Sequence, residues 1–285
     1  MRFLQVDVFC RGPYTGNPLA VFPEAADLDR SQMQKIASEM NLSESTFVTH
    51  ADSDSYRVRI FTPRQELPFA GHPTLGTTWV LRHLGLVTAE EVIQESQAGQ
   101  TVVRVEGERL WFARTGRSGA DIEEAAPSFR RLAHGLALEP RDLGLEAREL
   151  GRNGMLLPAV SGAGIDQLIV PVRDADTLLR CAPAADLAWD EGVVGFYCFT
   201  ATQAGRLQAR GFFPSLGIAE DPATGSAAAS LGVYLAHRLG DIDVEIAQGE
   251  QVGRPSTIYL DAEEQSVRVG GRCAHVLTGA LEQLP

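Results

Sequence analysis

The chain has 285 residues, of which 44% are hydrophobic, so it can fill one large core or two medium ones. Its formal net charge of −12 and its lack of a basic cluster argue against a nucleic-acid partner. It contains no apolar run long enough to span a bilayer and no signal-peptide pattern. We therefore expect no membrane partner and a cytoplasmic location.

Cysteine and histidine spacing gives no sign of a metal site. The four cysteines are far apart and form no CxxC pair, and the six histidines form no short ligand pair such as HExxH. Reduced and mostly buried thiols are the ordinary state of such cysteines. The sequence therefore predicts no metal bound by protein side chains.

The first elements follow from alternation and capping. Residues 3–9 alternate as a strand does, and Leu19–Phe22 looks like the hairpin partner of that strand. Asp29 or Ser31 is placed to cap a helix that ends near Met40. We expect these elements to begin an N-terminal domain.

A carboxylate follows this helix directly, at Glu44, where a short strand begins between two serines. One interpretation is a solvated residue at the end of a strand. The other is a general base near a domain cleft, with a pKa that partial burial raises. The surrounding residues alone leave both open.

The next motif joins a strand to a helix. Residues 56–63 read as a strand, residues 66–76 read Glu-Leu-Pro-Phe-Ala-Gly-His-Pro-Thr-Leu-Gly, and an apolar helical pattern then runs to Leu84. Pro73 suits the first helical position, where its missing N–H costs nothing. His72 either caps this helix or contributes to a site.

The domain boundary is predicted from composition. Residues 99–114 resemble a hairpin, and the polar, turn-rich stretch 115–128 follows it. We expect an N-terminal domain over residues 1–118 and a C-terminal domain over 128–271. The last strand, within residues 272–285, is expected to pair back onto the first domain.

The second half repeats the strand-to-helix motif. A strand over Leu207–Phe213 leads into an acidic, Pro-containing turn, and an alanine-rich helix follows from Gly225 to about Leu239. Thr224 or Ser226 is placed to cap that helix. Unpaired N–H groups at a helix start favour an anion. Two such helix starts across a cleft would suit a small anionic substrate.

Five motifs in order carry a resemblance to a known family. Together they resemble the PhzF-like phenazine-biosynthesis protein family, which is related in fold to diaminopimelate epimerase. The motifs are residues 16–22, 40–48, 67–76, 220–227 and 248–256, the last through its Gln-Gly and Gly-Arg-Pro-Ser pieces.

The resemblance implies an α+β fold of two similar domains, each a curved mixed β-sheet around a long central helix. It also implies a cofactor-independent isomerase that works by proton transfer, and a homodimer. The phenazine enzyme isomerises trans-2,3-dihydro-3-hydroxyanthranilate, which is the first specific substrate to consider. Two alternatives stay open: an epimerase or racemase of another small acid, and a non-catalytic protein that binds small anions.

The resemblance also assigns roles by position. Glu44 falls at the family's acid/base, and His72 and Asp221 are implied to hold the substrate's polar groups and to help move protons. Residues implied to bind substrate are Gly71, Gly225, Ser226 and Asn17. The related epimerases use paired cysteines at the two helix starts, where this chain has His72 and Ser226. A racemisation by two thiols is therefore not expected.

Overall fold

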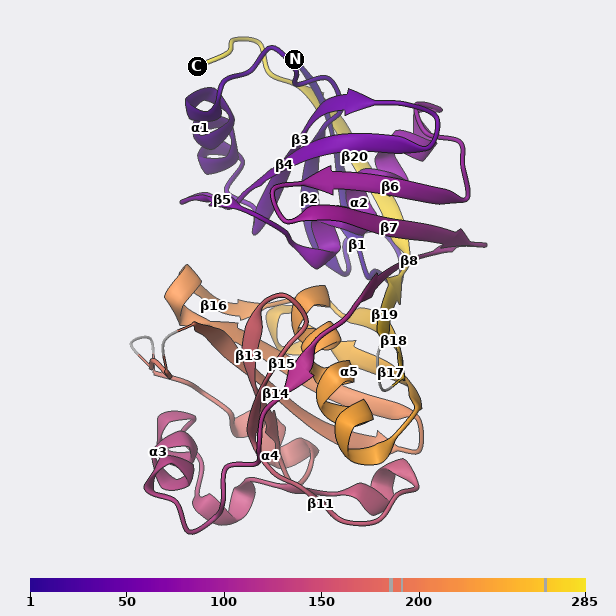
Figure 1. The fold of residues 1–285 in the computed structure, drawn as a ribbon. Coiled ribbons are helices and arrows are strands. Elements are labelled where there is room, and N and C mark those ends of the chain that lie inside the picture. Colours follow the sequence, from indigo (N-terminus) through magenta and orange to yellow (C-terminus); the bar gives the residue numbers. More distant parts are fainter. Residues whose placement is uncertain (185–186, 191, 264–265) are drawn as a thin grey trace. The chain divides into compact units, whose positions relative to one another are not determined.

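The computed structural model of the protein describes residues 1–184, 187–190, 192–263 and 266–285. Its contacts divide the chain into two compact units (Figure 1). Unit 1 comprises Met1–Ala113 and Gly270–Pro285, and unit 2 comprises Arg114–Val269. The polar stretch 115–128, which the composition predicts as the domain boundary, directly follows the division between Ala113 and Arg114 and lies within unit 2.

Unit 1 is a mixed sheet wrapped around one helix. Helix α2 contacts strands near both ends of the sheet, including β1, β2, β3, β6 and β7. The sheet has the order β20-β1-β2-β3-β4-β6-β7-β8, with β2–β3 and β4–β6 parallel and the other neighbours antiparallel, and β5 also pairs with β4. The elements are β1 Arg2–Val8, β2 Asn17–Phe22, α1 Arg30–Met40, β3 Glu44–Ala51, β4 Ser55–Phe61, β5 Glu66–Leu67, α2 Gly71–His83, β6 Glu91–Ser96, β7 Gly99–Glu106, β8 Arg109–Arg114 and β20 Cys273–Ala280.

Unit 2 has the same plan around α5, which contacts β9, β12, β13, β17 and β18. Its sheet has the order β9-β12-β13-β14-β15-β17-β18, with β13–β14 and β15–β17 parallel, and β16 also pairs with β15. The elements are β9 Arg117–Ser118, α3 Pro127–Gly135, η1 Pro140–Asp142, β10 Leu145–Glu146, η2 Ala147–Leu150, β11 Met155–Leu156, β12 Ala159–Gly162, β13 Asp166–Pro171, α4 Ala175–Arg180, β14 Val193–Gln203, β15 Arg206–Phe213, η3 Pro214–Leu216, β16 Ile218–Asp221, α5 Gly225–Leu239, β17 Ile242–Gln248, η4 Glu250–Val252, β18 Ser256–Glu263 and β19 Ser266–Gly271.

The two units share one chain order. In unit 1 the run is β1-β2-α1-β3-β4-β5-α2-β6-β7, and in unit 2 it is β12-β13-α4-β14-β15-β16-α5-β17-β18. Corresponding strands also pair with the same directions in both units. Both the expected α+β fold and its internal repeat are therefore confirmed, with α2 and α5 in equivalent places.

Strand β20 completes unit 1 from the far end of the chain. It pairs antiparallel with β1, from Arg2 opposite Ala280 to Val8 opposite Cys273. Both chain ends, marked N and C in Figure 1, lie near α1, and the Met1 amino group donates to the Leu281 carbonyl at 2.7 Å. The prediction that the last strand pairs back onto the first domain is confirmed.

Helix α1 is capped as the sequence predicts. The Asp29 side chain accepts from the Gln32 N–H at 2.9 Å, and the Gln32 side chain accepts from the Asp29 N–H, which completes a capping box. The helix ends at Asn41 in the left-handed conformation. Its apolar face packs against Phe22, Phe47 and Phe61.

The predicted start of α2 and the predicted side-chain cap of α5 need correction. Helix α2 starts at Gly71, because the Thr74 N–H already bonds to the Ala70 carbonyl, so Pro73 is the third helical residue and not the first. At α5 the cap position is Thr224, as one alternative had it, but its side chain makes no capping bond. The acidic turn is also partly wrong, since Ile218–Asp221 forms strand β16.

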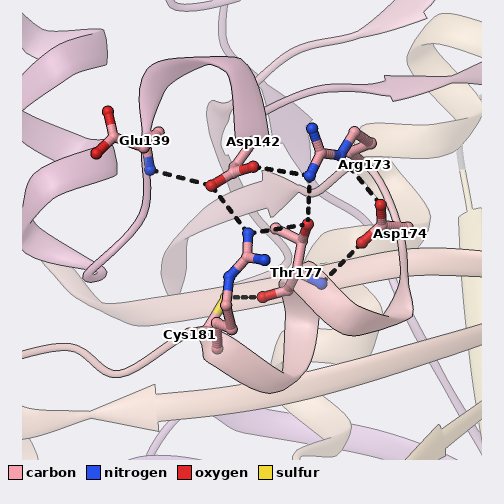
Figure 2. Close-up of polar contacts among 7 residues, drawn as sticks. Glu139, Asp142, Arg173, Asp174, Thr177 and Cys181 are labelled. Atoms are coloured by element: carbon pink, nitrogen blue, oxygen red, sulfur yellow. Dashed lines mark hydrogen bonds and ion pairs between the residues drawn. The ribbon is translucent and has the colours of Figure 1, made fainter.

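A buried carboxylate ties three segments of unit 2 together (Figure 2). Asp142 Oδ1 pairs with Arg173 at 3.0 Å, and its Oδ2 accepts from Arg180 at 3.0 Å and from the Glu139 N–H at 3.1 Å. Arg173 follows β13 and Arg180 ends α4. The carboxylate therefore holds α4 against the chain segment that contains η1.

Asp142→Ala is expected to lower the free energy of unfolding by about 1–3 kcal/mol, because three donors lose a buried acceptor. Both arginines are about half exposed, so the loss should stay below the about 3–5 kcal/mol expected when a fully buried ion pair is broken. Chemical denaturation measures it. Asp190→Ala is the matched control, since Asp190 is exposed and lies 3.9 Å from its one arginine partner in the described chain. An equal loss of stability in both variants would contradict a stabilising role for the Asp142 contacts.

Two further expectations from the sequence concern a membrane-spanning helix and a metal site. Within the described ranges, no helix is both long and apolar enough to cross a bilayer. In the same ranges, no three side chains among His, Cys, Asp and Glu come together as a group that would hold a metal ion. All four cysteines are free thiols, and three of them are buried.

Candidate active site

Glu44 is the first residue of β3, and its side chain faces the central helix of unit 1. Side chains alternate along a strand, so Glu44 and Thr46 share one face. Thr46 accepts a hydrogen bond from Thr77 of α2 at 2.9 Å, which identifies that face. Glu44 is only 9% exposed. The interpretation as a solvated strand end is therefore wrong.

His72 meets this carboxylate from the first turn of α2. Its Nε2 lies 3.3 Å from Glu44 Oε2, and the side chain is 4% exposed. Burial lowers the pKa of His72 to about 3, because the imidazolium loses its hydration. The imidazole is therefore neutral at neutral pH. Depending on its tautomer, its Nε2 can either donate a hydrogen bond to Glu44 or accept one from it.

A buried network fixes the start of α2. The Tyr56 hydroxyl donates to Gln94 Oε1 at 2.9 Å and contacts the Thr78 hydroxyl at 2.8 Å. Gln94 Nε2 in turn donates to the Thr74 hydroxyl at 3.0 Å. Thr74 is two residues after His72, so β4 and β6 together hold the helix turn that carries the imidazole.

Close packing at Gly76 also sets the position of α2. A Cβ atom there would lie 2.6 Å from Leu19 Cδ2 and 2.7 Å from Val8 Cγ2, both in the core. We expect Gly76→Ala to cost about 1–3 kcal/mol in the free energy of unfolding, because the helix must move away from β1 and β2. Denaturant titration measures the loss. Gly12→Ala is the control, since a Cβ there meets nothing within 4 Å; an equal change in both variants would contradict the close approach.

The substrate-binding residues predicted in unit 1 lie close to Glu44 or at the helix start. Asn17 is buried, and its Oδ1 accepts from the Ser43 hydroxyl at 3.0 Å, next to Glu44 in sequence. Gly71 is the first residue of α2, whose cap residue Ala70 provides no side-chain bond. The N–H groups of Gly71 and His72 therefore lack both an intrahelical partner and a side-chain cap.

In unit 2 the remaining predicted residues gather at the start of α5. Asp221 is buried at the end of β16, and its Oδ2 accepts from the Thr224 hydroxyl at 2.6 Å. Gly225 and Ser226 are the first two residues of α5, and the side chain of the cap residue Thr224 makes no capping bond to their helix. The structure thus brings Asp221, Gly225 and Ser226 together, in a unit separate from Glu44 and His72.

Two site residues were missed from the sequence. Gln248 ends β17 and donates to the Asp221 carbonyl at 2.8 Å, and Tyr197 of β14 donates to Gln248 Oε1 at 2.9 Å. Gln248 belongs to one of the five motifs, so a buried amide at a strand end was a usable signal. Tyr197 lies in an apolar strand that gave none.

The model of one known family matches nearly the whole chain. The model of the PhzC-PhzF family, described as phenazine biosynthesis-like protein, matches residues 6–279. The chain belongs to the PhzC-PhzF family.

Members with curated names support an activity class. One relative is a trans-2,3-dihydro-3-hydroxyanthranilate isomerase of Pseudomonas aeruginosa, 36% identical, with 94% of this chain and 92% of that protein covered. Another is an uncharacterized isomerase of Pasteurella multocida, 33% identical, with 97% and 92% covered. Like these relatives, this PhzC-PhzF member is an isomerase.

Solved structures agree with the fold. A predicted epimerase from Pseudomonas aeruginosa superposes with a TM-score of 0.82 at 31% identity, over 99% of both chains. A probable proline racemase from Agrobacterium radiobacter reaches a TM-score of 0.61 at 11% identity, over 100% of this chain and 93% of the other. At that identity the likeness concerns the fold alone, which the PhzC-PhzF family shares with racemases.

Proposed function

We propose that this protein isomerises a small carboxylate-bearing substrate by acid/base catalysis, without a cofactor, and that Glu44 moves the proton. The observation that carries the proposal is the buried Glu44 carboxyl group 3.3 Å from the neutral imidazole of His72. The P. aeruginosa relative suggests trans-2,3-dihydro-3-hydroxyanthranilate as the first substrate to test.

In the proposed reaction, Glu44 begins as a carboxylate and takes a proton from a substrate carbon. The electron pair of that C–H bond enters the conjugated system and shifts the double bonds. Glu44, now a carboxylic acid, returns the proton to another carbon of the same system, so no atom is gained or lost. The His72 Nε2 position beside the carboxyl group suits a partner that stabilises both protonation states of Glu44.

Each unit supplies candidate binding groups. In unit 1, the uncapped N–H groups of Gly71 and His72 suit a substrate carboxylate, with Asn17 nearby. In unit 2, the uncapped N–H groups of Gly225 and Ser226 offer the same chemistry, and Asp221 suits the substrate's polar groups. A small anionic substrate would use these donors better than a neutral one.

The test is solvent-proton exchange. The protein is incubated with trans-2,3-dihydro-3-hydroxyanthranilate in deuterated water, absorbance follows substrate loss, and mass spectrometry follows deuterium at carbon. We expect turnover, and a deuterium content of the product that reports how often the proton on Glu44 exchanges with solvent. No turnover at enzyme concentrations near that of the substrate would overturn this substrate assignment.

A second candidate is an epimerase or racemase of another small acid. It is favoured by the likeness to the predicted epimerase, at 31% identity. The same deuterium readout separates the two, because epimerisation places deuterium on the carbon that loses the proton. A panel of chiral amino and hydroxy acids serves as the substrate set.

We also propose that the protein acts as a homodimer in the cytoplasm. Four free cysteines suit a reducing compartment. Light scattering after size exclusion tests the assembly: a mass near 30.8 kDa at micromolar concentration would contradict the dimer.

A further inference from the structure

The side-chain amide of Gln248 in unit 2 has only one possible orientation. Its Oε1 lies 3.3 Å from the Thr224 backbone N–H, which can only donate. Its Nε2 lies 2.8 Å from the Asp221 backbone carbonyl, which can only accept. Because both partners are backbone groups, the amide cannot be flipped without two unfavourable contacts.

This orientation also sets the direction of the Thr224 hydroxyl. Gln248 Nε2 makes a second contact, at 3.1 Å, with Thr224 Oγ1, and an amide nitrogen there can only donate. The hydroxyl therefore accepts from Gln248 and sends its own proton elsewhere. Asp221 Oδ2 lies 2.6 Å away and receives it. A hydrogen bond this short is typical of an O–H donor to an ionised carboxylate.

We propose that Thr224 and Gln248 are positioning residues that hold Asp221 ionised, with Oδ2 engaged as an acceptor. Resting on the proposed function, in which Asp221 contacts the substrate, this gives the chemistry of the group that Asp221 recognises. An ionised carboxylate attracts an N–H or O–H donor and repels another carboxylate. Asp221 therefore takes the amino or hydroxyl group of the substrate, and the substrate carboxylate binds elsewhere.

The surroundings of Asp221 favour the hydrogen bond that the Thr224 hydroxyl donates to it. Tyr197 donates to Gln248 Oε1, and burial raises the pKa of this phenol, so it stays a neutral donor. Glu220 and Arg210 are paired with each other at 2.7 Å, and Glu220 points to the other face of β16. Two further charged residues, Glu250 and Arg254, follow Gln248 in the segment after β17.

Close packing leaves Thr224 and the loop little freedom. A Cβ atom at Gly211, the strand partner of Asp221, would lie 2.9 Å from Thr224 Oγ1. A Cβ atom at Gly249 would lie 2.5 Å from the Pro222 carbonyl, and Gly249 has a φ of +87°. Side chains at either glycine would displace the groups that make these hydrogen bonds.

The test measures the pKa of Asp221 directly, by NMR titration of carboxyl-labelled aspartate in the substrate-free protein. The Asp221 resonance is assigned from its loss in Asp221→Asn. Thr224→Val removes the donor and should raise the pKa of Asp221 by about one to two units, the value of a hydrogen bond to a charged group. Thr224→Ser keeps the hydroxyl and should leave this pKa within about 0.3 unit.

Gln248→Glu gives the same test through another residue. A carboxylate there accepts from Thr224, which turns the hydroxyl away from Asp221, so the pKa of Asp221 should rise at least as far as in Thr224→Val. Tyr197→Phe leaves the two backbone contacts of Gln248 intact and should change the pKa of Asp221 by less than about half a unit.

The proposal is overturned if Thr224→Val and Gln248→Glu both leave the pKa of Asp221 within about 0.3 unit of wild type. It is also overturned if Asp221 is protonated at pH 7 in the wild type. These readings need no substrate, so they stand apart from the proposed reaction. If the protein shows no isomerase turnover but the pKa of Asp221 shifts as expected, the proposed function is wrong and the hydrogen-bond arrangement is still supported.

Discussion

Glu44→Gln should lower kcat by about 10²–10⁴-fold, the usual contribution of one placed acid/base group. The amide has nearly the same shape as the carboxyl group but cannot take a proton from carbon. Because the substrate's binding groups are untouched, KM should change much less than kcat. Steady-state absorbance kinetics with the deuterium-exchange substrate measure both constants.

The matched control for this variant is Glu91→Gln, since Glu91 is an exposed carboxylate of the same unit, paired with Arg104 at 3.0 Å. It should keep wild-type kinetics. Glu44→Asp keeps the carboxylate but withdraws it by one methylene. Its kcat should lie between those of Glu44→Gln and Glu91→Gln. A decrease in kcat of less than about fivefold in Glu44→Gln would show that Glu44 is not the group that transfers the proton.

His72 should make the folded protein sensitive to acid. Its pKa is about 3 in the folded state, against about 6.5 for an unperturbed histidine. Above pH 6.5 both states are neutral there, and the group does not affect stability. As the pH falls from 6.5 towards 3, only the unfolded state gains this proton, so unfolding becomes easier. The loss should reach about 2 kcal/mol near pH 5 and about 4–5 kcal/mol near pH 3.

Urea denaturation of wild type and His72→Asn at several pH values between 7.5 and 4 measures this contribution. The variant should be less stable at pH 7.5, because it leaves the imidazole volume unfilled, yet lose less stability on acidification. His50→Asn is the control, because His50 lies on the surface beside Asp52. Parallel curves for wild type and His72→Asn would show that burial does not suppress protonation of His72.

Local sequence signals predict the elements that local rules control. The cap at Asp29 and the predicted helix ends near Met40 and Leu239 all agree with the structure. The start of α2 was missed by two residues, because proline suits several positions of the first turn. The choice among them depends on the extended backbone at Ala70, and no sequence pattern encodes that.

The candidate site divides in the same way. Glu44 and His72 were identified through their motifs, and their pairing depends on the parallel register of β2 with β3 and on the packing of α2. Gln248 was not identified, because it reaches Asp221 across 27 residues of sequence, through the pairing of β15 with both β16 and β17. Contacts set by strand register are invisible to motif spacing.

The pairing of β20 with β1 has a consequence for synthesis on the ribosome. Unit 2 is one continuous segment, so all of its strands can emerge and assemble in sequence order. Unit 1 must wait with one side of β1 open until residues 273–280 arrive, after unit 2 has been made. During that interval β1 presents an unpaired edge, the kind of surface that chaperones cover and that aggregation exploits.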